Sequence, residues 1–366
     1  MRLHVLGVPH TQTTKEFCGC AFTSKVHKFL KMMSGRGHEI YHYGHTNVDW
    51  SYPDVEHVEV VTDLDHGQAY GIDYVNNKTW KTTGFNQFDI NDHAYNTFVL
   101  RAVKEINLRK RPNDIVCITF GFGHKAVADQ LPDLINIETG IGYPASFARW
   151  RVYESHAIMN AMYGAESISQ LKQDWYWRVI PNYFDPEDFV FDTKKEPYAL
   201  FLGRIYTGKG VDIAIEATLR AGIKLKIAGQ GSLADMGYTQ TPEHVELIGY
   251  ADPELRAKLL SKAQCLIIGS KYNEPFAGVQ IEAFLSGTPV VSPDWAVFPE
   301  TNINSLTGFR CHTLREFALA IEDCKGLEPH AIRQWAQQYT LEQVAVQFEQ
   351  YFQDVLNVYT GKGWVE

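Results

Sequence analysis

The sequence lacks the features of a membrane-spanning, exported or disulfide-bonded protein. No apolar run approaches the ~18 residues that cross a bilayer, and residues 1–7 have neither the apolar core nor the small-residue cleavage site of a signal peptide. The six cysteines follow no framework spacing, and Cys18-Gly19-Cys20 is too short for the usual CxxC motif. These absences predict a protein of the reducing cytoplasm, which is the host cytoplasm if the source is viral.

Basic charge is also scarce. The 366 residues carry 34 Lys and Arg against 43 Asp and Glu, a net charge of -9. Residues 1–180 hold 18 basic and 19 acidic side chains, whereas residues 181–366 hold 16 and 24. The acidity therefore belongs to the second half, and 11 of the 14 histidines lie in the first. Because binding to nucleic acid usually needs a basic surface, this balance argues against it.

The length and the order of elements predict two α/β domains. At about 150 residues per domain the chain holds two. Strand and helix patterns alternate from residue 3, and a second series starts at residue 198, after a Pro-containing linker over 180–197. We expect domains at 1–182 and 183–340, with a C-terminal helix at about 341–366 that packs back on the first. Open α/β sheets bind ligands at the carboxyl ends of their strands, which places the active site in the cleft between the domains.

The most specific stretch runs from Asn273 to Val290 and carries two carboxylates eight residues apart. Glu274 follows an apolar strand, and Glu282 is expected two turns into a helix over 277–286. The small pair Ala277-Gly278, after Phe276, lets ligand oxygens approach backbone N–H groups at the start of that helix, where an anion is favoured. Glu282 would then accept hydrogen bonds from vicinal hydroxyls, as a carboxylate does for a ribose.

A second group of motifs follows two strands of the same domain. Gly203-Arg204 and Lys209-Gly210 bound one loop, and Gly229-Gln230-Gly231 forms another. Arg204 and Lys209 supply two cations that suit a diphosphate, and cations there stabilise the charge that grows on a departing phosphate. Each pair alone is also typical of a solvated loop. All three motifs occur in order at strand ends, which favours a binding site.

This order of motifs resembles the donor domain of glycosyltransferase family 4, over about residues 180–325. The resemblance implies an α/β GT-B fold: two facing Rossmann-like domains with parallel sheets and C-terminal helices. It implies retaining transfer from a nucleoside diphosphate sugar, with UDP as the expected carrier, no cofactor and no essential metal. Arg204 and Lys209 would bind the diphosphate, Glu274 the donor sugar and Glu282 the ribose. The sequence departs from the family at Ala277, where Gly usually follows the Phe.

The first half offers fewer candidates, all from looser similarity. Gly19 is the one glycine where the family has a Gly-rich loop, and His124 stands where it often has a His that meets the sugar. A structural role for His124 is an equal alternative, and His93 is a weaker rival. Glu138 and Arg149 lie in a segment that resembles uncharacterised relatives, and they are candidates for the acceptor side. Glu138 is equally well explained as a cap of the following turn.

We therefore expect a glycosyltransferase that moves a sugar to a hydroxyl of a glycan, a lipid-linked or a small polar acceptor. One alternative is a transferase acting on a hydroxymethylated base of viral DNA, supported by the near-neutral first half, the basic cluster at 109–111 and Arg149-Trp150-Arg151. Another alternative is a sugar-nucleotide epimerase of the same fold, which would consume the donor without an acceptor.

Overall fold

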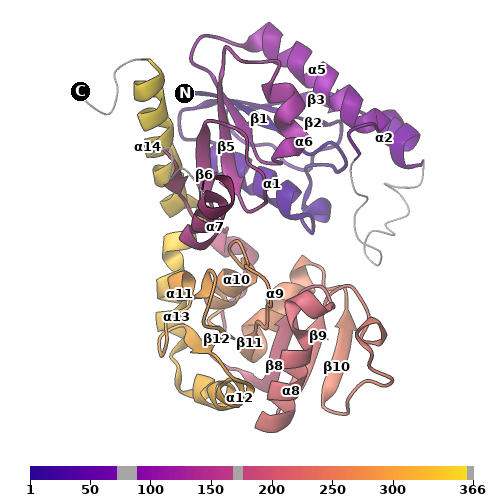
Figure 1. The fold of residues 1–366 in the computed structure, drawn as a ribbon, viewed down its shortest axis with the longest axis vertical. Coiled ribbons are helices and arrows are strands. Elements are labelled where there is room, and N and C mark those ends of the chain that lie inside the picture. Colours follow the sequence, from indigo (N-terminus) through magenta and orange to yellow (C-terminus); the bar gives the residue numbers. More distant parts are fainter. Residues whose placement is uncertain (72–88, 168–175, 361–366) are drawn as a thin grey trace.

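The computed structural model describes residues 1–71, 89–167 and 176–360, which form two α/β domains one above the other (Figure 1). The first domain is built on a parallel seven-stranded sheet of order β3-β2-β1-β4-β5-β6-β7. Its strands are β1 (Arg2–Leu6), β2 (Glu39–His45), β3 (Val55–Val61), β4 (Ile115–Ile118), β5 (Ile135–Ile141), β6 (Trp150–Tyr153) and β7 (Arg178–Val179).

Helices cover both faces of this sheet, as the expected strand–helix alternation requires. They are α1 (Ala21–Met33), α2 (Asp63–Tyr70), α5 (His93–Arg109), α6 (Phe122–Ala128) and α7 (His156–Ser167). In α1 the apolar face is fully buried and consists of Val26, Phe29, Leu30 and Met33. Asp92 caps α5 by accepting a hydrogen bond from the backbone N–H of Tyr95, which satisfies one of the free donors at a helix start.

The second domain repeats the design with a parallel six-stranded sheet of order β10-β9-β8-β11-β12-β13. Its strands are β8 (Glu196–Leu202), β9 (Lys224–Ala228), β10 (Val245–Gly249), β11 (Ala263–Ile267), β12 (Val290–Pro293) and β13 (Gly308–Cys311). Its helices are α8 (Val211–Ala221), α9 (Pro253–Lys262), α10 (Val279–Leu285), α11 (Phe298–Thr301), α12 (Leu314–Asp323) and α13 (Pro329–Ala336). The parallel sheets and their order confirm the predicted pair of Rossmann-like domains.

The chain crosses between the domains at two adjacent places. Phe184, on the way into the second domain, lies beside Tyr339 and Leu341, on the way back. The backbone N–H of Phe184 donates to Tyr339 O at 2.9 Å, and that of Leu341 donates to Phe184 O at 3.0 Å. The two crossings are therefore held together by backbone hydrogen bonds.

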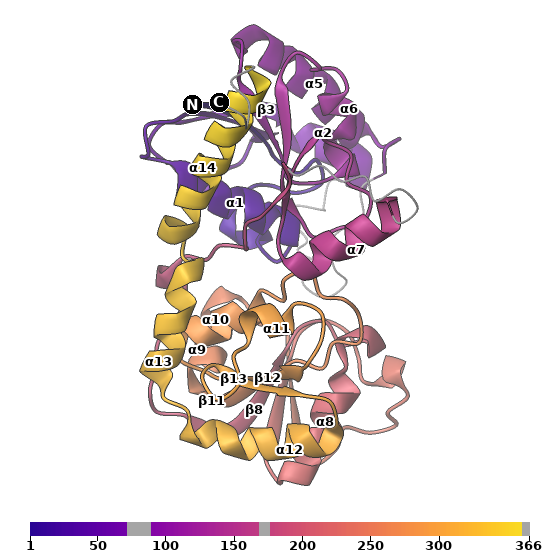
Figure 2. The same cartoon turned by 60° about the vertical axis from the view of Figure 1, so that its left-hand side comes forward.

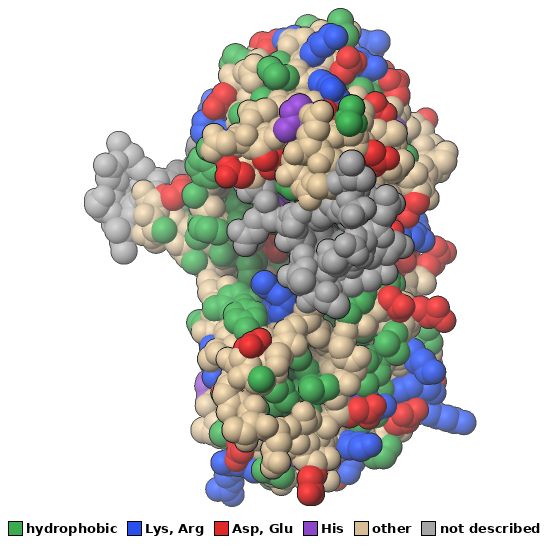
Figure 3. All heavy atoms as spheres, turned by 90° about the vertical axis from the view of Figure 1, so that its right-hand side faces the viewer, with side chains coloured by type: hydrophobic (Ala, Val, Ile, Leu, Met, Phe, Trp, Pro, Cys, Tyr) green, Lys and Arg blue, Asp and Glu red, His purple; other side chains and the backbone are tan. Residues whose placement is uncertain are grey.

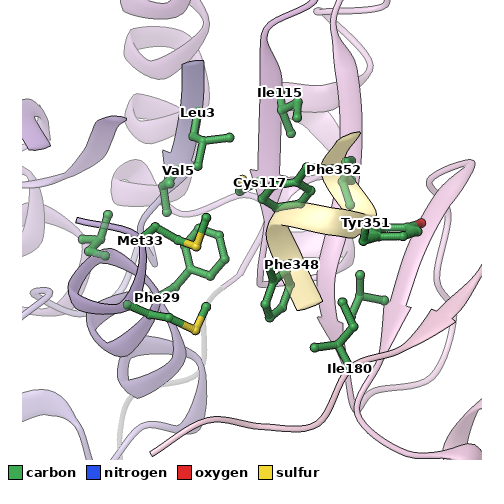
Figure 4. Close-up of a cluster of buried hydrophobic side chains, with 14 of the residues drawn as sticks. Leu3, Val5, Phe29, Met33, Ile115, Cys117, Ile180, Phe348, Tyr351 and Phe352 are labelled. Atoms are coloured by element: carbon green, nitrogen blue, oxygen red, sulfur yellow. The ribbon is translucent and has the colours of Figure 1, made fainter. Parts of the chain in front are cut away.

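The last helix, α14 (Leu341–Tyr359), packs on the first domain. Figure 2 shows α13 and α14 following one another along one side of the molecule, beside the second and the first domain respectively. Phe348 and Phe352 of α14 are buried in the same apolar cluster as Leu3 and Phe29 (Figure 4). The Tyr351 hydroxyl accepts from the backbone N–H of Arg151 at 3.0 Å. No helix in the described ranges is both long and apolar enough to span a membrane.

Candidate active site

Three loops meet at the carboxyl edge of the second sheet, after β8, β9 and β11. They lie so close that only glycine fits at the contacts. A Cβ on Gly210 would stand 1.9 Å from Gly269 O, and one on Gly229 would stand 1.9 Å from Gly203 O. Gly210 also has φ 65°, in the left-handed region that glycine tolerates at no steric cost. The glycines of the predicted motifs therefore bring the polar loops together.

Lys209 and Glu274 meet between these loops. Lys209 Nζ lies 2.6 Å from Glu274 Oε1, and the Ser270 hydroxyl donates to the same oxygen at 2.5 Å. Glu274 is 5% exposed, so a cation and a hydroxyl compensate its buried charge. Lys209 Nζ also lies 5.0 Å from the ring centre of Tyr272. Ser270 and Tyr272 are contacts that the sequence did not indicate, because neither belongs to a recognisable motif.

Arg204 lies in the same loop as Lys209 but in a different setting. Its side chain is exposed and its guanidinium carbon lies 5.3 Å from the ring centre of Tyr206. Within the residues that the structure describes, Arg204 has no hydrogen bond and no ion pair. The site therefore holds one cation paired with a carboxylate and one that is available to an anion.

The turn between Glu274 and α10 differs from the expected geometry. The predicted helix over 277–286 begins only at Val279 and has seven residues, so Ala277 and Gly278 precede it. Ala277 has φ 54°, a left-handed conformation that costs an L-residue about 1–2 kcal/mol. Phe276 is buried and lies near Phe184 of the domain crossing, with ring centres 6.3 Å apart. The chain thus holds an alanine in the conformation that suits the glycine found there in the family.

Glu282 lies in the first turn of α10, not two turns into the helix as the sequence predicted. Its carboxylate is paired with Arg256 of α9, whose Nε lies 2.6 Å from Glu282 Oε2. The side chain of Glu282 is 15% exposed to solvent. Arg256 belongs to no predicted motif, because it lies on another helix, 26 residues before Glu282 in the sequence.

The first domain reaches this site at the start of α7. The hydroxyl of Ser155 donates to Pro275 O at 2.6 Å, next to Glu274. The carboxylate of Glu300 accepts from the backbone N–H groups of His156 and Ala157, at 2.9 and 2.7 Å. The first contact connects the turn beside Glu274 directly to the other domain, and the contacts of Glu300 connect α11 to it.

His124 has in this structure the structural role that the sequence left open as the alternative to a contact with the sugar. It is fully buried; its Nε2 lies 2.8 Å from Gly7 O, and its Nδ1 accepts from the N–H of Phe120 at 3.3 Å. Burial lowers the pKa of His124 to about 3, so the ring is neutral and Nε2 donates to the carbonyl. Both nitrogens are occupied by backbone.

Glu138 likewise has a structural role in this structure. It is fully buried, and its Oε2 accepts from the N–H groups of Phe147 and Ala148, both at 2.9 Å. The Tyr143 hydroxyl donates to Oε1 at 3.0 Å. This is the turn-capping role that the sequence left open as an alternative.

The three remaining candidates of the first half, His93, Arg149 and Gly19, lie on different elements of the first domain. His93 starts α5 and is paired with Asp65 at 3.1 Å. Arg149 is exposed, with its guanidinium carbon 4.9 Å from the ring centre of Trp150. Gly19 is exposed in the turn before α1. Among the described residues no cluster of three or more His, Cys, Asp or Glu is arranged to hold a metal ion.

Comparisons with known proteins agree with this geometry. Residues 185–359 match the family model of glycosyl transferases group 1. Glycogen synthase of Mycobacterium tuberculosis is 34% identical over 122 residues, which cover 31% of this chain and 29% of that protein. The chain thus matches less than a third of the length of this relative.

Solved structures resemble the whole chain. Sucrose-phosphate synthase from Thermosynechococcus elongatus superposes with a TM-score of 0.69 at 17% identity, over 98% of this chain and 100% of that one. The Anabaena protein HepE, solved in complex with UDP and glucose, gives a TM-score of 0.56 at 14% identity, over 96% and 99%. Two parallel sheets in this arrangement make the fold GT-B, and residues 185–359 of the chain are similar to glycosyl transferases of group 1.

Proposed function

We propose that the protein is a retaining glycosyltransferase that moves a sugar from a nucleoside diphosphate sugar to an acceptor hydroxyl. The observation that carries this proposal is the meeting of Lys209, Glu274 and the available cation Arg204 at the carboxyl edge of the second sheet. Two cations at the end of a parallel sheet suit a diphosphate, and the carboxylate between the loops suits the hydroxyls of a sugar. UDP is the expected carrier, and the UDP bound to HepE supports this choice.

In the proposed reaction, the donor's diphosphate takes the place of Glu274 beside Lys209 and also meets Arg204. The bond between the anomeric carbon and the phosphate oxygen breaks, and a bond forms between that carbon and the acceptor oxygen. The acceptor proton passes to the departing phosphate oxygen. The protein positions the reactants and stabilises the charge on the leaving diphosphate. Released from Lys209, Glu274 is available to accept hydrogen bonds from the sugar.

No essential metal is part of this proposal, because Arg204 and Lys209 supply the positive charge that a metal ion provides elsewhere. Activity should persist in an excess of EDTA. Complete loss that one divalent ion restores would contradict this part of the proposal and leave the transfer itself in place.

A glycan, a lipid-linked molecule or a small polar molecule is the proposed acceptor, in preference to DNA. The basic cluster at 109–111 is engaged within the protein: Arg109 pairs with Glu105, Lys110 with Asp133, and Arg111 contacts Glu39. Over the described part of the face in Figure 3, acidic and basic side chains are mixed. A gel-shift series with DNA at falling salt tests this choice, because phosphate contacts strengthen as salt is removed.

The proposal is tested by identifying the donor and then its product. UDP, ADP and GDP are first ranked by the rise they cause in the melting temperature, since a ligand of the folded state stabilises it. The matching nucleotide sugars are then incubated with and without acceptors, and the products are analysed by mass spectrometry. Transfer that needs an acceptor and keeps the anomeric configuration is the expected result. Conversion of the sugar nucleotide without an acceptor would identify an epimerase instead, and stabilisation by none of the nucleotides would refute the donor site.

A further inference from the structure

The pair between Arg256 and Glu282 uses only one of the two carboxylate oxygens. Arg256 Nε lies 2.6 Å from Glu282 Oε2, and Nη2 contacts that same oxygen. Glu282 Oε1 has no hydrogen-bond partner in the part of the chain that the structure describes. The carboxylate is partly accessible, with 15% of its side chain exposed. One oxygen is thus fixed by two donors, and the other remains an unused acceptor at the carboxyl edge of the sheet.

The charge of Glu282 also acts on a cation of the other domain. Lys28 of α1 is partly buried, with its Nζ 4.5 Å from the ring centre of Phe184. Burial lowers the pKa of Lys28, and the negative charge of Glu282 opposes that shift most strongly. Arg256 contributes directional hydrogen bonds from a planar fork, which a compact ammonium does not reproduce.

We propose that Arg256 is a positioning residue for the nucleotide, which holds Oε2 of Glu282 so that Oε1 is presented to a ribose hydroxyl. The inference rests on the proposed function and on the ribose contact that the sequence predicts for Glu282, and it adds the residue that orients that contact. Because a hydrogen bond to a charged acceptor is strong and depends on geometry, a fixed oxygen discriminates better between ribose and deoxyribose than a mobile one. Arg256 thereby becomes a determinant of selectivity for ribonucleotides although it does not touch the ribose.

The test is isothermal titration calorimetry of the wild type, Arg256→Ala, Arg256→Lys and Arg220→Ala. The probes are UDP, ADP and GDP, followed by the 2′-deoxy and 3′-deoxy forms of the tightest binder. Arg220 is a matched control, because its Nε lies 2.8 Å from Glu216 on α8, in the same domain and remote from the three loops. Arg256 is 37% exposed, so its replacement should leave the fold intact, which a melting curve verifies.

The expected pattern is a loss of discrimination. The wild type should bind the ribonucleotide about tenfold more tightly than a deoxy form, which is the worth of one hydrogen bond to a charged group. Arg256→Ala should weaken the ribonucleotide about tenfold and hardly affect the deoxy form. Arg256→Lys should recover part of the difference, and Arg220→Ala should match the wild type. In turnover, Arg256→Ala should raise the KM of the donor and leave kcat nearly unchanged.

Two results would overturn the inference while the proposed function stands. Arg256→Ala could bind ribonucleotide and deoxy form as the wild type does, or it could weaken both equally, which would make Arg256 a general source of positive charge. If the wild type binds none of the three nucleoside diphosphates, the proposed function itself fails and this inference fails with it.

Discussion

The first five strands of the two sheets run in one order, β3-β2-β1-β4-β5 in the first domain and β10-β9-β8-β11-β12 in the second. In the second domain the strands end in glycine-containing loops, which bring Arg204, Lys209 and Glu274 to one edge of the sheet. In the first domain His124, in α6 after β4, and Glu138, in the middle of β5, are buried and hydrogen-bonded to backbone groups of the same domain. The same backbone frame therefore carries an open polar site in one domain and a closed polar interior in the other.

The largest expected difference between the two domains is in how much stability each loses at acidic pH. Nine histidines of the first domain have pKa values lowered by burial, with His10 and His45 at about 4 against 6.5 in the unfolded chain. Between these values the unfolded chain binds protons that the folded one does not. The stability is therefore complete above pH 6.5 and is lost as the pH falls toward 4. His10 and His45 should each cost about 2 kcal/mol at pH 5.

Hydrogen exchange at pH 7 and pH 5, corrected for intrinsic rates, measures this effect domain by domain. Amides of β1, β2 and β4 should lose far more protection than those of β8, β9 and β11. Equal losses in both sheets would mean that the histidine-rich interior does not set the acid sensitivity.

Removal of a donor-site cation should leave both domains folded and abolish most of the activity. Lys209→Ala should reduce kcat at least about a hundredfold, the usual cost of losing one group that stabilises transition-state charge. Arg204→Ala should reduce it at least about tenfold, since Lys209 remains. Steady-state kinetics with saturating donor measure both. Near wild-type kcat in the two variants would refute the diphosphate role, and Lys125→Ala, on the surface of α6, controls for a general loss of positive charge.

His124→Ala should affect stability more than catalysis. The substitution leaves Gly7 O and Phe120 N unpaired in the interior and opens a cavity, at a cost of about 3 kcal/mol in the free energy of unfolding. The kcat/KM of the folded fraction should stay within about threefold of the wild type. Urea denaturation and initial rates provide the two quantities. A hundredfold loss of activity at unchanged stability would restore His124 as a substrate contact.

The smallest effect is expected at Ala277. Ala277→Gly removes a left-handed strain of about 1–2 kcal/mol and adds about 0.5–1 kcal/mol of unfolded-state entropy, for a gain near 0.5 kcal/mol. Ala145→Gly in the first domain, where φ is 64°, should give a similar gain. The KM of the donor should change only for Ala277→Gly, because that turn adjoins Glu274. A matching change in Ala145→Gly would show that the effect is not local to the donor loops.

The sequence predicted that these polar loops lie at strand ends of the second sheet, because each loop is a local unit. A strand, a glycine that permits close approach and a charged residue at fixed spacing are enough to place Arg204, Lys209 and Glu274 at one sheet edge. The alternation of strands and helices predicted two α/β domains, and the resemblance of the motifs to a known family predicted the GT-B fold. The bounds of α8 can be read from the sequence in the same way, because Gly210 and Gly222 lie at its two ends.

What the sequence could not give depends on tertiary packing. The partners Ser270 and Arg256 come from positions without a motif, and the contact of Ser155 with Pro275 joins residues 120 apart. Spacing does not reveal which way a side chain points, and for His124 and Glu138 the structure shows the buried alternative. The start of α10 was misplaced because an alanine in the left-handed region leaves no trace in helix propensity.

The packing of α14 on the first sheet has a consequence for biosynthesis. Leu3 and Phe29 emerge from the ribosome early, but Phe348 and Phe352, which complete their cluster, emerge some three hundred residues later. Domains generally fold as units during synthesis, the N-terminal one first. In this protein the second domain can fold first, because residues 183–340 are synthesised before α14, which completes the hydrophobic core of the first domain. Until α14 is synthesised, the apolar surface that it covers on the first domain stays exposed to solvent. We expect chaperones that bind apolar surfaces to bind the nascent chain there.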